Sequence, residues 1–333
     1  MVPEKREILR LNPKSLNHRM EYALSTIGSY PRPEWFRDYL RKQEGLQKDS
    51  RGVVDESYMK AVGEVLGEQR NAGIDLLTDG QLLWRNMLCH LYDNMEGFRL
   101  SGLIRYFDNN MYYQMPEVFG KVERKKSLIL DEYIAACSVE KKIKPVLSCY
   151  SLVDLSRNKF YGDESEFLMD VAGVMNQEAK ALADAGASII QVDEPSLLYA
   201  DKEGVEAAGE AFEVLTKGVD SSFILATYFR DAKTLYPEVL DYPFDVLGLD
   251  FVEGLDVNLN IIKEHPTKKI IQAGVVDGRT TLMENPSKVK ELIDSISGLV
   301  SGEKLFLSPN TGLEYLPYVK ASEKMGVLSA SVD

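Results

Sequence analysis

The segment at residues 188–198, Ser-Ile-Ile-Gln-Val-Asp-Glu-Pro-Ser-Leu-Leu, constrains the fold of this chain more than any other stretch. Its apolar first half predicts a buried strand that ends on two adjacent carboxylates, Asp193 and Glu194. Pro195 follows, and because proline has no N–H to donate it favours the start of a helix or a tight turn. Parallel α/β sheets bind ligands at the carboxyl ends of their strands, so this segment predicts a fold class, a strand direction and a candidate site.

Short apolar strands that end on polar residues recur along the chain, and helical stretches separate most of them. Parallel strands that alternate with helices in this way close into a barrel. We therefore expect an α/β fold, a TIM (β/α)8 barrel, formed as a single domain by residues 21–333, with residues 1–20 as a polar amino-terminal arm. The predicted strands span residues 22–27, 74–78, 144–149, 188–192, 223–227, 246–250, 269–275 and 304–308.

Residues 82–143 interrupt this alternation after the second predicted strand. Residues 82–97 and 126–142 have the pattern of helices, and aromatic pairs at 106–107 and 112–113 flank an Asp-Asn-Asn turn. The pattern predicts a helix–β-hairpin–helix insertion whose hairpin lies over the barrel mouth. Further helices are expected over 34–49, 55–71 and 164–185.

Charge and cysteine content narrow the function classes. The chain has a net charge of −13, whereas surfaces that bind nucleic acid or anionic membranes need clustered Lys and Arg, so we expect neither partner. No apolar run approaches the ~18 residues of a membrane span. Scattered cysteines without a C-x-x-C pair suit a reducing compartment, and the amino terminus lacks an apolar signal segment. We expect a cytoplasmic protein.

Polar side chains gather at the predicted strand ends, the face on which a TIM barrel builds its active site. Asp193 and Glu194 are strand neighbours that point to opposite faces, so we expect one to face the mouth and the other to cap a helix or pair with a base. Asp79 and Asp277 also suit simple turns, and Trp84 suits packing as well as stacking on a ligand. The candidates by position are Ser29, Asp79, Gln81, Asp193, Glu194, Tyr228, Asp250, Glu253, Asp277, Arg279 and Asn310.

The residues alone leave the chemistry open. Carboxylates with few basic partners suit a hard cation such as magnesium and the amino group of a substrate equally well. Neither glycine-rich phosphate pattern occurs, and no Ser-His-Asp or Cys-His arrangement is indicated. The histidines, His18, His90 and His265, are scattered along the chain.

The strand-end motifs, taken in order, resemble those of the cobalamin-independent methionine synthase family. They read TIGSYP at 26–31, DGQ at 79–81 with WRNM at 84–87, QVDEPSL at 191–197, AGVVDGR at 273–279 and SPNTGL at 308–313. Family enzymes are two barrels in tandem, of which the carboxyl-terminal one is catalytic. This chain resembles most the amino-terminal, zinc-free barrel, through residues 227–229, 248–254 and 275–279.

The resemblance implies methyl-transfer chemistry. In the family, a zinc ion keeps the homocysteine thiol as a thiolate, which attacks a methyl group on a folate nitrogen. The family's zinc ligands are a His-x-Cys after strand five, a Glu after strand six and a Cys after strand eight. This chain has Ala-Thr-Tyr-Phe at 226–229 and Thr311 at the last position, with only Asp250 or Glu253 near strand six. The resemblance therefore implies no family zinc site and no tightly bound cofactor.

The resemblance also implies an amino-acid pocket. Ile27 and Ser29 match the loop that holds the carboxylate and Asp193 matches the acid that holds the ammonium group, whereas Gln81 replaces a further family acid. The expected substrate-binding residues are Ile27, Ser29, Asp79, Gln81, Asp193 and Glu194. The expected donor-side and pocket residues are Trp84, Arg85, Tyr228, Asp250, Glu253, Asp277, Arg279 and Asn310.

These expectations combine into one functional hypothesis. A stand-alone barrel acts in methyl transfer from a 5-methyl-folate or methyl-pterin donor to homocysteine in methionine biosynthesis, beside a separate zinc-bearing catalytic barrel. Two alternatives stay open. One is a non-catalytic companion that binds a ligand and supports such a barrel, and the other is a zinc-free enzyme with a different small-molecule substrate.

Overall fold

The computed structural model describes residues 21–45, 53–87, 89–107, 112–300 and 304–332. The arm predicted over residues 1–20 lies outside this part of the chain. Among the described residues, no helix is long and apolar enough to cross a membrane.

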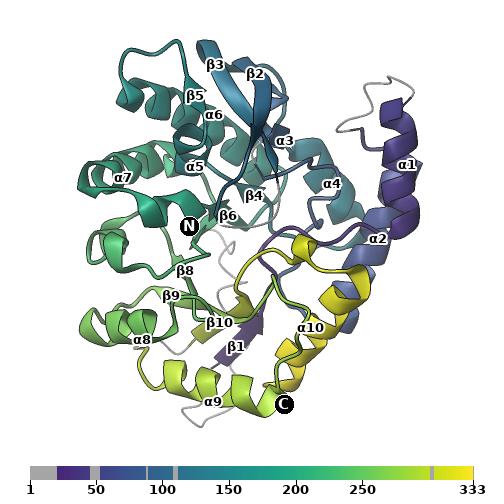
Figure 1. Cartoon of the computed structure of the whole chain (residues 1–333), viewed down its shortest axis with the longest axis vertical. Coiled ribbons are helices and arrows are strands. Elements are labelled where there is room, and N and C mark those ends of the chain that lie inside the picture. The colour runs from purple at the N-terminus through teal and green to yellow at the C-terminus, as the bar shows by residue number, and fades with distance from the viewer. Residues whose placement is uncertain (1–20, 46–52, 88, 108–111, 301–303, 333) are drawn as a thin grey trace, which may run out of the picture.

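A ring of parallel strands forms the centre of the fold (Figure 1). The seven-stranded sheet runs in the order β1-β10-β9-β8-β7-β6-β4, and every neighbouring pair is parallel. Its strands are β1 Glu21–Leu24, β4 Val146–Leu147, β6 Ile189–Asp193, β7 Ser222–Ala226, β8 Val246–Asp250, β9 Ile270–Val276 and β10 Lys304–Pro309. Two isolated parallel bridges, Ser25 to Leu76 and Leu77 to Ile143, close the ring between β1 and β4.

The strand predicted over 74–78 is wrong as a regular strand, because side chains occupy several of the backbone groups a ladder would use. The Asp75 carboxylate accepts the N–H of Leu24 at 2.9 Å. The Gln69 amide bonds both the N–H and the carbonyl oxygen of Thr78, at 3.0 and 2.8 Å. The segment still occupies the predicted second position, since its bridges join it to both sides of the ring. The barrel expectation is therefore confirmed, with one position held by a bridged segment.

Helices surround the sheet (Figure 1). The helices predicted over 34–49, 55–71 and 164–185 are confirmed as α1, α2 and α6, although 46–49 lies outside the described residues. Aspartates cap several helices, such as Asp55 before α2 and Asp163 before α6. The longer helices are α1 Glu34–Gly45, α2 Glu56–Asn71, α4 Leu130–Val139, α6 Glu164–Asp184, α7 Lys202–Thr216, α8 Leu255–Glu264, α9 Pro286–Ser297 and α10 Tyr318–Ala330. The short ones are α3 Cys89–Tyr92, α5 Tyr150–Asp154, η1 Pro195–Tyr199, η2 Lys233–Leu235, η3 Glu238–Asp241 and η4 Leu313–Tyr315.

The insertion is built around an antiparallel hairpin, β2 Met95–Ile104 and β3 Tyr113–Arg124, to which β5 Arg157–Asn158 adds a third strand. The hairpin is confirmed, but the predicted pairs at 106–107 and 112–113 mark its strands poorly, because β2 ends at Ile104 and, of the four aromatic residues, Tyr113 alone lies in a strand, at the start of β3. The helix predicted over 82–97 is wrong, because the Asn86 side chain caps the short α3 and Gly97 joins β2. At φ 85°, Gly97 packs where an added Cβ would lie 2.5 Å from a carbonyl oxygen of β3. The helix predicted over 126–142 is the shorter α4.

The barrel interior is layered, because residues two apart on a strand face the same side. An apolar layer lies at the strand starts, and it contains Ala23, Leu76, Ile189, Ile224, Val246 and Phe306. Two residues further along the strands, polar residues such as Gln191 and Ser308 face the interior. Two residues beyond that layer lie Asp193, Asp250 and Asn310. The polar groups are therefore gathered at the carboxyl ends of the strands.

Candidate functional site

A cavity opens at the carboxyl ends of the barrel strands, and we name it the mouth cavity. It brings together five of the predicted site residues, Ile27, Ser29, Gln81, Asp193 and Tyr228. The other described residues that line it are Met87, Thr311, Gly312, Glu314 and Tyr315. Segments that are far apart in the chain thus meet at the face where a TIM barrel binds its ligand.

Asp193 is the buried carboxylate of the mouth cavity, with 6% of its surface exposed. One of its oxygens accepts the Gln191 amide N–H at 2.6 Å and the other accepts the Tyr228 hydroxyl at 3.1 Å. Burial raises the pKa of Asp193, whereas these two bonds and the charge of Lys144 lower it. The carboxylate is held in a fixed orientation by its neighbours.

Lys144 stands behind this carboxylate inside the barrel and is completely buried. Its ammonium donates to the Oε1 atom of Gln191, whose amide nitrogen donates in turn to Asp193. Burial lowers the pKa of Lys144 and the nearby Asp193 raises it. A cation, an amide and a carboxylate thus form one connected chain beneath the cavity.

Glu194 points away from the mouth cavity and serves the backbone. Its Oε1 atom accepts the N–H groups of Cys149 and Tyr150, at 2.6 and 3.0 Å, and its Oε2 atom accepts that of Ser151 at 2.6 Å. Burial raises the pKa of Glu194 to about 7, and these donors act in the opposite direction. The prediction that one acid of the pair faces the mouth and the other caps a helix therefore describes the geometry, and Glu194 is the one that caps α5.

Unusual backbone conformations gather around the mouth cavity. Among the described residues, the non-glycine positions with positive φ are Gln81 at 53°, Phe107 at 57° and Phe229 at 78°. Gln81 lines the cavity. The rings of Phe107 and Phe229 lie 5.2 Å apart in a cluster with Ile27, Tyr228 and Tyr315, which we name the aromatic rim of the mouth cavity. Such conformations cost about 1–3 kcal/mol each and concentrate at functional sites. Phe107 comes from the loop end of the hairpin, so the insertion covers the mouth as predicted.

A model of the cobalamin-independent synthase amino-terminal domain matches residues 96–301 of this chain. The chain belongs to the cobalamin-independent methionine synthase family. The methionine synthase of Saccharolobus solfataricus is 30% identical over 304 residues, which cover 90% of this chain and 91% of that protein. The methionine synthase of Sulfurisphaera tokodaii is 31% identical over 307 residues, which cover 90% and 88%. The predicted resemblance to the amino-terminal half of the family is confirmed.

Solved structures of the cobalamin-independent methionine synthase family share the fold of this chain. A B12-independent methionine synthase from Shewanella sp. W3-18-1 in complex with selenomethionine aligns with a TM-score of 0.78 at 20% identity, over 92% of this chain and 96% of that one. A putative vitamin-B12-independent methionine synthase from Listeria monocytogenes aligns with a TM-score of 0.73 at 16% identity, over 95% and 98%.

The residues at the family's zinc position do not fit a zinc ion in this chain. Asp250 is engaged by the N–H groups of Phe229, Val252 and Glu253, at 3.0, 2.9 and 2.9 Å, and by the Asn310 amide at 3.1 and 3.2 Å. Glu253 is paired with Arg279. Positions 226–229 and 311 contribute no thiolate or imidazole, which are the ligands that zinc prefers. Among the described residues, no three His, Cys, Asp or Glu side chains converge to hold a metal.

Several predicted residues outside the mouth cavity have structural contacts. Asp277 accepts the N–H of Arg279 at 2.7 Å, which is the turn that the sequence allowed. The guanidinium of Arg279 lies 5.0 Å from the centre of the Phe229 ring, at the rim. Asn310 accepts the N–H of Gly278 at 2.9 Å and so joins the ends of β9 and β10. The Nη2 atom of Arg85 donates to both carboxylate oxygens of Asp93, at 2.5 and 2.7 Å, and Arg85 is not among the described residues that line the mouth cavity.

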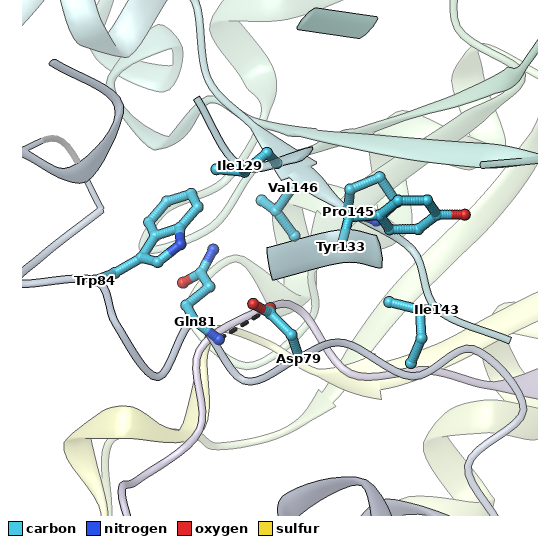
Figure 2. Close-up of a pocket in the computed structure, with 8 residues that line it drawn as sticks. All are labelled: Asp79, Gln81, Trp84, Ile129, Tyr133, Ile143, Pro145 and Val146. Atoms are coloured by element: carbon cyan, nitrogen blue, oxygen red, sulfur yellow. Dashed lines mark hydrogen bonds between the residues drawn. The ribbon is translucent and has the colours of Figure 1, made fainter. Parts of the chain in front are cut away.

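Asp79, Gln81 and Trp84 line a second cavity (Figure 2), and Gln81 also lines the mouth cavity. Asp79 accepts the Gln81 N–H at 3.0 Å, and burial raises the pKa of Asp79 to about 6. The Trp84 ring stacks on His90 with centroids 5.1 Å apart and donates to Glu132 at 3.2 Å. The predicted packing role of Trp84 thus describes most of its contacts.

Two charged residues near the mouth cavity were missed by sequence reasoning. Lys144 looked like the first residue of a strand, and only its place inside a closed barrel gives it a role. Glu314 lies in η4, past the last strand-end motif, so no motif drew attention to it. The sequence did contain a signal for Glu314. This acid comes two residues after Gly312, close behind the polar end of β10, and such a position lies near the mouth cavity.

Proposed function

We propose that this chain binds a homocysteine-like amino acid in the mouth cavity and acts in methyl transfer in methionine biosynthesis, with a methyl-folate or methyl-pterin as the donor. The Asp193 carboxylate accepts hydrogen bonds from the ammonium group of the amino acid. Ser29 and the backbone beside Ile27 receive its carboxylate. The donor meets the aromatic rim near Tyr228 and Arg279.

One observation carries this proposal, namely the orientation of Asp193 toward the cavity. Gln191 and Tyr228 fix the carboxylate at the floor, and Lys144 lies behind it. A preorganised carboxylate in a buried cavity suits an ammonium group, because charge-assisted hydrogen bonds are strong there. The Shewanella relative, described as a complex with selenomethionine, supports a ligand of this class.

The absence of fitting zinc ligands at positions 226–229 and 311 supports a division of labour. We propose that a separate zinc-bearing barrel supplies the thiolate chemistry, while this chain holds the ligand or supports that barrel. The engaged state of Asp250 favours this arrangement, because its oxygens already serve the backbone and Asn310. The non-catalytic companion remains the second candidate, and methyl-transfer assays separate the two.

The test measures binding and activity separately. Calorimetry of the whole chain with L-homocysteine and L-methionine measures affinity, with Asp193→Asn as the variant expected to lose binding. Methyl transfer from 5-methyl-folate is then assayed with the chain alone, with a zinc-bearing catalytic barrel alone, and with both. Wild-type protein that binds neither amino acid contradicts the proposal. Transfer that is unchanged by adding this chain leaves only the binding role.

A further inference from the structure

Glu314 is a second carboxylate in the mouth cavity. It lies in η4, just past the carboxyl end of β10, and lines the cavity together with Asp193 and Gln81. The two carboxylates therefore come from opposite ends of the sheet order, with β10 beside β1 and β6 beside β4. Only the closed barrel brings them to one cavity.

The cavity holds more negative than positive charge. Its described lining includes Asp193 and Glu314 but no lysine or arginine. Burial raises the pKa of Glu314, and the charge of Glu314 contributes to the raised pKa of Asp193, so the two carboxyls interact. Two carboxylates that share a buried site resist joint ionisation unless a cation enters.

The nearest basic groups serve other partners. Arg32 lowers the pKa of Glu314 through its charge, but its guanidinium donates to the backbone carbonyl oxygens of Leu82 and Trp84. Lys144 reaches Asp193 only through Gln191. Among the described residues, neither Asp193 nor Glu314 has an ion-pair partner within 4.0 Å. A ligand that carries a positive charge would supply the counter-charge that these basic groups do not.

We propose that Glu314 is a specificity-determining residue that binds the ammonium group of the ligand together with Asp193. The inference rests on the proposed amino-acid site and adds the residue that selects for the amine. An ammonium group has three N–H donors, and the oxygens of Asp193 already accept from Gln191 and Tyr228. Hydrogen bonds from the Ser29 and Tyr315 side chains lower the pKa of Glu314, and the lone pairs that a carboxylate has beyond these bonds supply a further acceptor and the second negative charge. Gln81, which lines the same cavity, contributes a neutral amide.

The experiment compares two probes that differ only in the amine. L-Methionine carries the ammonium group, and 4-(methylthio)butanoate is the same molecule without it. Glu314→Gln is expected to weaken L-methionine binding about tenfold or more, since a charge-assisted bond is lost, and to leave the desamino probe unchanged. Glu323→Gln removes the same charge from an exposed position of α10 and serves as the control.

A compensating variant completes the test. Gln81→Glu combined with Glu314→Gln returns a carboxylate to the cavity from its other side and is expected to restore part of the preference for L-methionine. Equal loss of both probes in Glu314→Gln, or no loss of either, overturns the role of Glu314. Wild-type protein that binds neither probe instead overturns the amino-acid site itself. Thermal unfolding of each variant establishes that it is folded.

Discussion

The Tyr228 hydroxyl donates a hydrogen bond of 3.1 Å to the Oδ2 atom of Asp193, and this bond joins the aromatic rim of the mouth cavity to its buried carboxylate. Tyr228 and Asp193 come from the ends of neighbouring parallel strands, β7 and β6. The charge state of the carboxylate therefore depends on an aromatic side chain that also shapes the mouth.

Tyr228→Phe is expected to weaken amino-acid binding at pH 7 by roughly tenfold, the value of one hydrogen bond to a charged group. Loss of the hydroxyl raises the pKa of Asp193 further, so less of the carboxylate is ionised at neutral pH. Calorimetry between pH 6 and pH 9 should find a loss that shrinks as the pH rises. Tyr199→Phe, on the exposed end of η1, is the control. A loss of the same size at every pH contradicts this explanation.

Lys144→Met is expected to shift the pH dependence of binding upward. The positive charge of Lys144 lowers the pKa of Asp193, so its removal leaves more of that carboxyl protonated near pH 7. Each unit of pKa corresponds to a tenfold change, so roughly tenfold weaker binding at pH 7 should recover in more alkaline buffer.

A second buried lysine provides the matched control for Lys144→Met. Lys324 is also completely buried. Its ammonium lies 2.6 Å from the Glu284 carboxylate, and neither residue is among those that line the mouth cavity. Lys324→Met should lower the stability and leave the affinity unchanged. A shared effect of the two variants on affinity would show that general destabilisation, not charge at Asp193, is responsible.

Asp193→Asn is expected to stabilise the folded chain in alkaline solution. Burial raises the folded-state pKa of this carboxyl above its unfolded value of about 3.9, so the folded chain holds the proton more tightly. Stability contributed by this group is therefore lost as the pH rises between the two pKa values. Urea unfolding should give the Asp193→Asn variant a larger advantage over wild type at pH 8 than at pH 5. If the free energy of unfolding differs between variant and wild type by the same amount at both pH values, a raised pKa of Asp193 in the folded chain is contradicted.

Glu194→Ala should destabilise the fold, because three N–H groups, two of them in buried hydrogen bonds, lose their acceptor. Each unsatisfied donor costs about 1–3 kcal/mol, so the free energy of unfolding should fall by roughly 3 kcal/mol or more. Glu194→Gln, which keeps one carbonyl acceptor, should lose less. Chemical denaturation of both variants gives the order, and a nearly neutral Glu194→Ala contradicts the capping role.

Local sequence patterns predicted those parts of the site that lie on regular strands. The alternation of side chains along β6 is sufficient to separate the roles of Asp193 and Glu194, because one step along a strand changes the face. The placement of the hairpin over the mouth followed from its position between two strands of the barrel.

The parts that could not be predicted depend on contacts between distant segments. The backbone groups around 74–78 bond to the side chains of Gln69 and Asp75, which no strand pattern reveals. Asp250 has the same strand-end position as Asp193, yet Asn310 and three N–H groups engage it. The partnership of Glu314 with Asp193 exists only once the barrel is closed.

Two single bridges, and not a ladder of pairs, close the ring between β1 and β4, and we name this part of the barrel the seam. Elsewhere ladders of paired residues join the strands, whereas here the backbone bonds of 76–77 form two single bridges, such as Leu76 N–H to the Leu24 carbonyl at 3.1 Å and Leu77 N–H to the Lys142 carbonyl at 3.0 Å. Local opening favours such places, so the amides of 76–78 should exchange hydrogen for deuterium faster than those of β6 or β9. Asp79 and Gln81 follow directly on this seam. Faster exchange at 76–78 than in β6 would mean that the wall of the mouth cavity next to Gln81 opens more readily than the wall that carries Asp193.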